Sequence, residues 1–427
     1  MKRLVNRIKN NQMLKAILTL GIGTVTGQVI SLLSQPILTT LCSPELLGTY
    51  SIVISLASIV IPIASLKLEL LIVTEKDNIE ADKITQTCCR LSYLVAILSL
   101  IYLSIMYFYG STNIAKLGAN ILLFPILIVV HGFRIIFTNY SNRFRDYKIV
   151  SKAGVWRSLI LTLIQLSSAF IGGGSLGQTI GYSISPLYAM KRQTQRYREH
   201  LKYRSKLKIQ ESIQIVKSNL SHILNLVPAE FVNTFAFSAI TLTVSGLFGT
   251  ATVGYYSLSI RILVTPLALI SVNVSQVFLK TIASKIQENL SAYECCLKTL
   301  KGLLFISIVG FTILFFIAPY VCERVFGIGW GQAGIYISIL CPMYASKFVV
   351  TSLTGVYTVA KSQKNQLIIQ ITFLLACGLL YLFTKSFSWN IEIYLAITSI
   401  VYTLLYVVML IDIVRVCRKV DLGVVKL

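Results

Sequence analysis

The sequence is poor in charged residues: 13% of its 427 residues are Asp, Glu, Lys or Arg, whereas 55% are hydrophobic. A soluble chain usually has about 25% charged residues. The mean hydropathy of +0.75 therefore indicates an integral membrane protein. Its apolar stretches recur in blocks of about 20 residues, the length of an α-helix that crosses roughly 30 Å of hydrocarbon. No alternating pattern of about ten residues dominates, which argues against a transmembrane β-barrel. We predict an all-α polytopic membrane protein.

The sequence also lacks the residue patterns of an enzyme. None of its three histidines is followed within five residues by Asp, and it has no Asp-x-Asp motif. It has no Gly-Lys dipeptide for an ATPase phosphate-binding loop, no metal-ligand spacing and no Cys-x-x-Cys among nine cysteines. We predict no enzymatic activity, no cofactor and no bound metal. Without an ATPase, any transport would be passive or driven by a gradient of H⁺ or Na⁺.

Twelve segments are long and apolar enough to be membrane spans. With soft edges, they are residues 14–41, 45–73, 85–109, 117–139, 149–171, 174–190, 217–247, 251–279, 293–318, 331–353, 365–384 and 391–414. The first has no small-residue cleavage site and is too long for a signal-peptide core, so we expect it to be retained as a helix.

The net charge of +23 is distributed unevenly. With the N-terminus inside, basic residues gather in the N-terminal tail 1–13, the loop 140–152 and the stretch 191–216. The opposite loops hold only three basic residues, which are Lys116, Arg324 and Lys385. By the positive-inside rule, the basic segments and both termini are cytoplasmic. The basic excess suits the anionic inner leaflet, and we predict no nucleic-acid partner.

The chain also shows signs of an internal duplication. Residues 48–54 read GTYSIVI and residues 254–260 read GYYSLSI, with Gly, Tyr and Ser matching at an offset of 206. Six spans on each side of a basic linker would give two bundles in the same orientation, a parallel repeat around a central cavity that opens alternately to each side. The expected parts are the tail 1–13, an N-terminal lobe 14–190, the linker 191–216, a C-terminal lobe 217–414 and a cytoplasmic tail 415–427.

Charged residues inside the spans are the candidate site, because a charge at the bilayer centre costs about 3 kcal/mol and usually faces a wet interior. The cations outnumber the acids, which predicts a cationic cavity; the cations are Lys67, Arg134, Arg157, Arg261 and Lys347, and the acids are Glu69 and Glu230. The alternative for the first three cations is snorkelling to the inner surface. For Arg261 and Lys347, expected near mid-span, it is an ion pair with Glu230. Glu69 and Glu230 could instead carry a coupling ion.

Two further expectations follow from residue chemistry. Lys67 and Glu69 are two residues apart, so on a helix they would not share a face or neutralise each other. A cation in a cavity with low-dielectric walls attracts anions, and guanidinium groups such as that of Arg261 grip phosphate with paired hydrogen bonds. An anionic cargo, with phosphate as a good candidate for the charge, is therefore expected.

Three motifs, taken in order, resemble the Wzx-type polysaccharide repeat-unit flippases of the multidrug/oligosaccharidyl-lipid/polysaccharide exporter superfamily. Residues 41–76 contain the Pro-Glu-x-x-Gly-x-Tyr turn and the basic-x-Glu pair Lys67 and Glu69, where Arg is the commoner basic residue. Residues 254–280, with Arg261, resemble the eighth helix of that family, and residues 326–342 resemble the entry to the tenth.

The resemblance implies a flippase that moves undecaprenyl-diphosphate-linked oligosaccharides from the cytoplasmic to the periplasmic leaflet of a bacterial inner membrane. O-antigen, capsule or a related lipopolysaccharide or polysaccharide would be the product. A polymerase and chain-length machinery would be its partners, beside membrane lipids. Alternatives are a cation or drug antiporter of the same superfamily, whose cargo would need more buried carboxylates, and a lipid II-type flippase, which usually has more spans.

Overall fold

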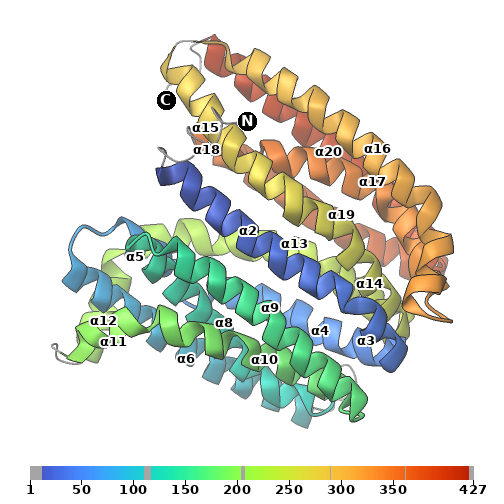
Figure 1. Cartoon of the computed structure of the whole chain (residues 1–427), viewed down its shortest axis with the longest axis horizontal. Coiled ribbons are helices and arrows are strands. Elements are labelled where there is room, and N and C mark those ends of the chain that lie inside the picture. The colour runs from blue at the N-terminus through green and yellow to red at the C-terminus, as the bar shows by residue number, and fades with distance from the viewer. Residues whose placement is uncertain (1–11, 110–116, 203–206, 289, 361, 423–427) are drawn as a thin grey trace. The chain divides into compact units, whose positions relative to one another are not determined.

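A computed structural model describes residues 12–109, 117–202, 207–288, 290–360 and 362–422, so most of the N-terminal tail and the end of the C-terminal tail lie outside it. The described residues are almost entirely helical (Figure 1). They form two compact units, residues 1–242 and 243–427. The division falls within helix α13, downstream of the expected linker 191–216.

Unit 1 is built on helices that match the first six expected spans. They are α2 (Gln12–Leu33) with α3 (Gln35–Leu41), α4 (Pro44–Val60), α6 (Asn78–Phe108), α8 (Asn120–Arg143), α9 (Tyr147–Phe170) and α10 (Gly174–Gln193). Two short helices, α11 (Gln195–Lys202) and α12 (Ile209–Ser218), follow before α13 (Leu220–Phe248).

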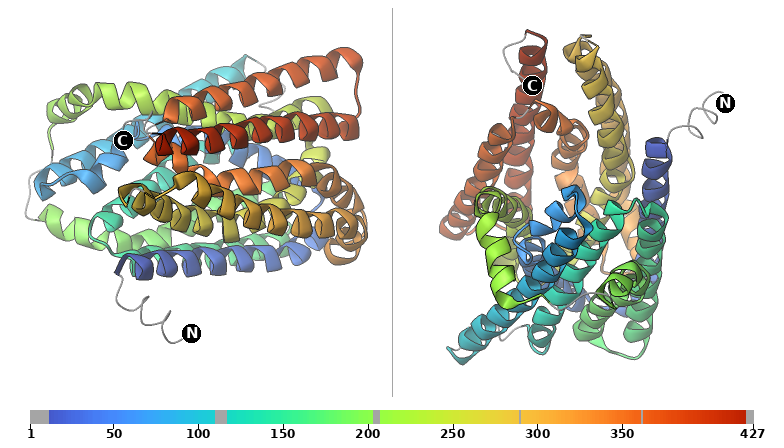
Figure 2. Two further views of the ribbon diagram at one scale, coloured as in Figure 1. Left: turned by 90° about the horizontal axis from the view of Figure 1, so that it is seen from above. Right: turned by 90° about the vertical axis from the view of Figure 1, so that its left-hand side faces the viewer.

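Unit 2 continues with helices for the later spans. They are α14 (Thr250–Pro266), η3 (Leu267–Ser271), α15 (Val272–Gln287), α16 (Ala292–Phe326), α17 (Gly331–Leu353), α18 (Gly355–Val359), α19 (Gln363–Phe387) and α20 (Ile391–Asp421). Its last two long helices, α19 and α20, lie side by side at the red end of the colour scale (Figure 2).

Ten helices among the described residues are long and apolar enough to cross a membrane. Large apolar side chains on their outer faces, such as Leu94, Ile97 and Ile101 of α6, are half exposed. A soluble protein would not expose so continuous an apolar surface, whereas lipid tails can cover it. The chain is therefore a multi-pass α-helical membrane protein. The remaining expected spans correspond to α2 with α3, and to α10. The full count of twelve stays a prediction.

The two units repeat the same local architecture, which supports the predicted duplication. Helices α4 and α14 each have 17 residues and begin 206 residues apart, the offset of the repeated motif. Each then leaves α-helical geometry at the equivalent point, α4 into a 3₁₀ turn at Ile61–Ile63 and α14 into the π-helix η3. In unit 1, α8 packs against α4, α6 and α10; in unit 2, α17 packs against α14, α16 and α20.

Small residues let neighbouring helices approach closely, as is common between membrane helices. In unit 1, Gly23 and Gly27 of α2 lie against Ser151 and Ser158 of α9, and the Ser151 hydroxyl donates a 2.7 Å hydrogen bond to the Thr19 carbonyl. In unit 2, a Cβ at Gly334 of α17 would lie 2.6 Å from the Ala318 carbonyl oxygen of α16. Only glycine permits that contact, because backbone atoms cannot move aside.

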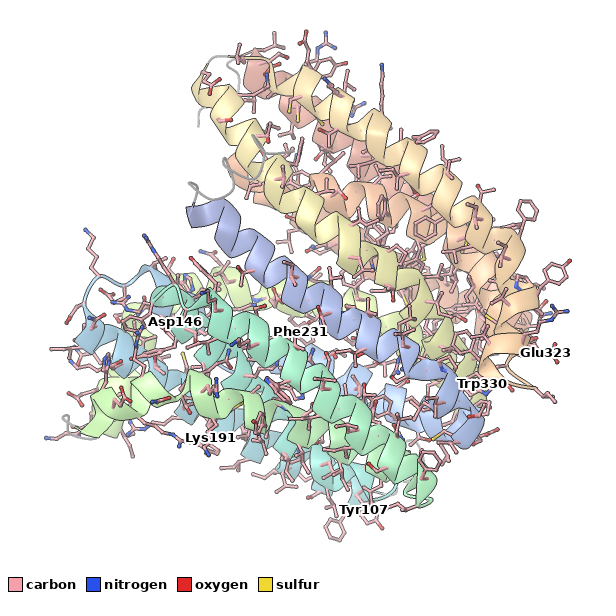
Figure 3. The ribbon with its side chains drawn as sticks, in the orientation of Figure 1. Tyr107, Asp146, Lys191, Phe231, Glu323 and Trp330 are labelled. Atoms are coloured by element: carbon pink, nitrogen blue, oxygen red, sulfur yellow. The ribbon has the colours of Figure 1, made fainter. Side chains whose placement is uncertain are left out.

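The described parts of the basic stretch, residues 191–202 and 207–216, pack against other helices of unit 1. The Arg90 guanidinium of α6 donates to the Ser212 hydroxyl at 2.7 Å and to the carbonyls of Leu207 and Lys208. Tyr197 of α11 lies in a buried cluster with Phe137 and Tyr140 of α8. Unit 1 thus has a compact end, which Lys191 and Asp146 mark in Figure 3, with Tyr107 at the opposite end of the same unit.

Candidate functional site

The expected span 45–73 is interrupted at its charged residues. After α4, residues 61–63 form the 3₁₀ turn η1, residues 68–70 form a second 3₁₀ turn, η2 (Leu68–Leu70), and α5 (Leu71–Thr74) follows. Leu66 and Lys67 adopt left-handed backbone conformations, with φ of 54° and 61°. Such conformations are strained for residues with a side chain, and they cluster at functional sites. The charged pair therefore lies on a broken helix.

This break brings together a cluster of three charges from two helical segments. Lys67 Nζ lies 3.3 Å from Glu230 Oε2 of α13 and 4.0 Å from Glu69 Oε1. The Ser65 hydroxyl donates to Glu69 Oε2 at 2.5 Å, and His222 Nε2 lies 3.2 Å from the Lys67 carbonyl oxygen. The expectation that Lys67 and Glu69 would not pair is wrong, because the rule for positions two apart holds only on a regular helix.

Exposure differs sharply among these charges. The side chain of Glu69 is 2% exposed and that of Lys67 15%, whereas that of Glu230 is 29% exposed. One cation thus faces two carboxylates, one buried and one open. Lys67 is held in a network, which argues against simple snorkelling. Glu230 thus has Lys67 as a partner within unit 1, and the alternative in which it pairs with Arg261 or Lys347 stays a prediction.

A second group of predicted residues meets in a cavity inside unit 1. Arg134 of α8 and Arg157 of α9 both line a cavity of about 170 Å³. Small and polar residues of α2, α8, α9 and α10 complete the wall; they include Gly23, Thr24, Thr138, Ser151, Gly154 and Gln193. The Arg134 Nε atom is buried and has no hydrogen-bond partner among the described residues.

The chemistry of this cavity favours an anion. No carboxylate is among its lining residues, so the wall offers no counter-charge to the two arginines. An unpaired polar atom in a buried site costs free energy that a bound acceptor would recover. His131, one turn before Arg134, is not part of it: its Nε2 lies 3.1 Å from the Tyr182 carbonyl oxygen, and its ring stacks on that of Tyr182.

The two predicted cations of unit 2 lie at different levels. Hydrogen bonds from Ser259 to the Ala333 carbonyl and from Ser271 to the Phe348 carbonyl set α14 and α17 parallel and fix their register. Arg261 lies near the first bond and Lys347 beside the second. At 1.5 Å per residue the two levels differ by about 15 Å along these helices, and the mid-span depth expected for each cation stays a prediction. Lys347 Nζ lies 5.3 Å from the ring centroid of Tyr344.

One charged cluster was missed by sequence reasoning. Asp82 of α6 accepts a 2.7 Å hydrogen bond from the Tyr140 hydroxyl, which lies 3.0 Å from His200 Nδ1. His200 Nδ1 also lies 3.5 Å from Asp82 Oδ2. The search for Asp close after each histidine could not find a pair 118 residues apart. The cluster ties α11 to α6 and α8, so we assign it a structural role. No cluster of metal-ligating side chains occurs in the described parts of the chain.

Comparison with known proteins places this arrangement in a family. The family model described as "polysaccharide biosynthesis protein" matches residues 37–334, from α3 to the start of α17. The chain belongs to this polysaccharide biosynthesis family. Among curated proteins, none matches the sequence.

Comparison with solved structures shows that this chain has the fold of MOP-superfamily transporters. The lipid II flippase MurJ, in an inward closed conformation, matches with a TM-score of 0.69 at 17% identity, covering 95% of this chain and 90% of that one. An inward-facing multidrug resistance MATE transporter matches at 0.63 and 14% identity, covering 92% and 96%. A MOP-superfamily transporter from Pyrococcus furiosus matches at 0.62 and 15%, covering 95% and 96%. These likenesses establish the fold that this chain shares with those transporters.

Proposed function

We propose that this protein is a Wzx-type flippase that moves undecaprenyl-diphosphate-linked oligosaccharide units from the cytoplasmic to the periplasmic leaflet of a bacterial inner membrane. O-antigen, capsule or a related surface polysaccharide would be assembled from these units. Membership of a polysaccharide biosynthesis family and the transporter fold support this reading.

The single observation that carries the proposal is the pair Arg134 and Arg157 in one cavity without a carboxylate. A diphosphate offers acceptor oxygens that guanidinium groups bind with charge-assisted hydrogen bonds, which are about twice as strong as neutral ones. In this reading Arg134 and Arg157 take the diphosphate, and Lys67, Arg261 and Lys347 are further candidates for contact with the cargo. A cationic drug would be repelled by the same side chains.

The carboxylates would then couple or balance the transport. Glu230 is the more exposed partner of Lys67, so it can exchange H⁺ or Na⁺ with water more readily than the buried Glu69. Neutralising Glu230 would leave Lys67 with Glu69 as its remaining carboxylate in this cluster, so the lysine would be more available to the cargo. Coupling is therefore assigned to Glu230 and a fixed counter-charge to Glu69.

The test is made in the native host with the gene deleted. Loss of surface polysaccharide, together with lipid-linked repeat units trapped on the inner leaflet, is the expected result, and the wild-type gene should restore export. Unchanged polysaccharide and an increased sensitivity to cationic drugs would contradict the proposal and favour the antiporter. Trapping of the peptidoglycan precursor instead of a repeat unit would favour a lipid II-type flippase.

A further inference from the structure

A second, larger pocket lies on unit 1, at the end where Lys191 is labelled in Figure 3. It has a volume of about 690 Å³ and lies between the start of α9, the end of α10 and the helix α11. Its lining is strongly basic: it contains Lys148, Lys152, Lys191, Arg192 and Arg198, with Glu199 as its acid. Five cations and one carboxylate give this wall a net charge of +4, from five minus one.

The lining residues form two facing stripes. On α9, Lys148, Lys152 and Trp156 follow one another at intervals of four residues and therefore share a helical face. On the neighbouring helix, Tyr188 and Arg192 are also four residues apart, and the stripe continues into α11. Helices α9 and α10 pack against each other, so the two stripes enclose one groove.

The groove is polarised along its length. Its inner end holds Trp156 and Tyr188, whose rings pack edge to face with centroids 5.6 Å apart. Lys148 and Lys152 lie toward the outer end, and Lys148 precedes Trp156 by about 12 Å at 1.5 Å per residue. Aromatic rings of this kind are enriched at the level where membrane headgroups meet acyl chains. With the basic end at the cytoplasmic surface, as the sequence predicts, the pocket offers cations at headgroup level and aromatic surface just below it.

The five basic residues of the pocket are not held by acidic side chains of the described fold. Among the described residues, none of these five cations forms an ion pair, although the adjacent Arg196 is committed to Asp146 at 3.0 Å and lies over the Phe144 ring. The five pocket cations therefore differ from Arg196, whose ion pair and ring contact hold α11 in place.

We propose that this pocket binds the headgroup of an anionic membrane phospholipid, with its phosphate against the lysines and arginines and its glycerol and upper acyl chain against Trp156 and Tyr188. Juxtamembrane cations attract anionic lipids, and basic pockets between membrane helices bind their headgroups. The proposal does not depend on the flippase assignment. Ala153 and Ala189 line both this pocket and the Arg134–Arg157 cavity, so a bound headgroup would brace a shared wall.

The test uses the tryptophan of the pocket as its own reporter. The chain has three tryptophans, so replacing Trp330 and Trp389 by Phe leaves Trp156 alone. The full-length protein is reconstituted in phosphatidylcholine vesicles that contain a fixed fraction of either brominated phosphatidylglycerol or brominated phosphatidylcholine. Bromine quenches the fluorescence of nearby tryptophan. The ratio of quenching by brominated phosphatidylglycerol to quenching by brominated phosphatidylcholine therefore measures the local enrichment of the anionic lipid. Stronger quenching by the brominated anionic lipid is expected.

A matched pair of variants locates the effect. Changing Lys148, Lys152 and Arg192 to Gln should lower the enrichment by roughly tenfold or more, because each cation near an anionic surface contributes severalfold. The control changes Lys298, Lys301 and Arg418 to Gln, which removes the same charge from exposed positions of unit 2 and should leave the ratio unchanged.

Three results would overturn the proposal. They are equal quenching by the two brominated lipids in the parent protein, an equal loss in both triple variants, and an enrichment that survives the pocket variant. Inorganic pyrophosphate tests whether the phosphate in the pocket comes from a free anion instead of a lipid. If millimolar pyrophosphate lowers the quenching of the parent protein by brominated phosphatidylglycerol to the level seen with brominated phosphatidylcholine, the pocket is a site for a free anion rather than a lipid. Unfolding curves of each variant show whether the fold is intact.

Discussion

Lys67 Nζ lies 3.3 Å from Glu230 Oε2. This ion pair joins the segment between the 3₁₀ turns η1 and η2 to α13, across 163 residues of sequence. It sits where the backbone is left-handed at two successive residues, so the lysine is presented by a conformation that a regular helix would not give. The pair leaves Glu69 buried beside the same ammonium group. We therefore expect the loss of stability to depend on which of the three charges is removed.

Removing the cation is expected to cost more than removing the exposed acid. Lys67→Gln leaves the buried Glu69 without its cation and should lower the free energy of unfolding by about 2–4 kcal/mol, whereas Glu230→Gln should cost about 1 kcal/mol or less. Thermal unfolding in detergent measures both. The matched control is Lys83→Gln, because the side chains of the Lys83–Glu80 pair are 34% and 46% exposed, and so accessible an ion pair should contribute almost nothing. Equal losses for Lys67→Gln and Lys83→Gln would contradict the buried network.

The Asp82–Tyr140–His200 cluster predicts a purely structural effect. Tyr140→Phe removes the hydroxyl that donates to the buried Asp82 and should destabilise the protein by about 1–3 kcal/mol. The control is Tyr102→Phe, at an exposed position on α6, which should be neutral. At matched amounts of folded protein in the membrane, Tyr140→Phe should export polysaccharide as the wild type does. An export defect that is not explained by protein level would give this cluster a role in transport.

The glycine at the α16–α17 contact makes a prediction about packing. Gly334→Ala should destabilise unit 2 by about 1–3 kcal/mol, because the added methyl group meets backbone atoms of Ala318 and Pro319. Gly310→Ala, in α16, meets no atom within 4 Å and should be neutral or stabilising by up to about 1 kcal/mol. Unfolding measurements on the two variants check this, and the reverse ranking would mean that the two helices do not approach as described.

The expected orientation can be tested by chemical labelling. In a cysteine-free background, Lys385→Cys should react with a membrane-impermeant maleimide in intact cells, whereas Lys191→Cys should react only after the inner membrane is opened. The reason is the asymmetric distribution of basic residues, which predicts Lys191 to be cytoplasmic and Lys385 periplasmic. Labelling of Lys191→Cys from outside would reverse the orientation.

Much of the fold could be predicted from the sequence, because hydropathy alone marks segments that must be helical inside lipid. The offset of 206 residues also predicted an equivalence that the structure shows in the lengths and ends of α4 and α14. These features are local, or they repeat along the chain, and so they can be read from one sequence.

The contacts between charges could not be predicted in the same way. Lys67 pairs with Glu69 only because the helix breaks at residues 61–70, and periodicity arguments assume an unbroken helix. The pairs Lys67–Glu230 and Asp82–His200 form between distant segments, so no spacing rule reveals them. Arg134 and Arg157 were both expected in a cationic cavity, but that they meet in the same one follows from the packing of α8 and α9.

The most direct test of the central claim, that paired arginines take the diphosphate, is the amount of lipid-linked repeat unit trapped on the inner leaflet in the deletion host. The host carries wild type, Arg134→Gln with Arg157→Gln, or Arg134→Lys with Arg157→Lys, at matched membrane levels. The account predicts trapping by the glutamine pair, with a loss of export of roughly tenfold or more, and partial export by the lysine pair, which keeps the charge but loses the guanidinium geometry. Wild-type export by the glutamine pair would contradict the account, because the cavity would then serve packing and not the cargo.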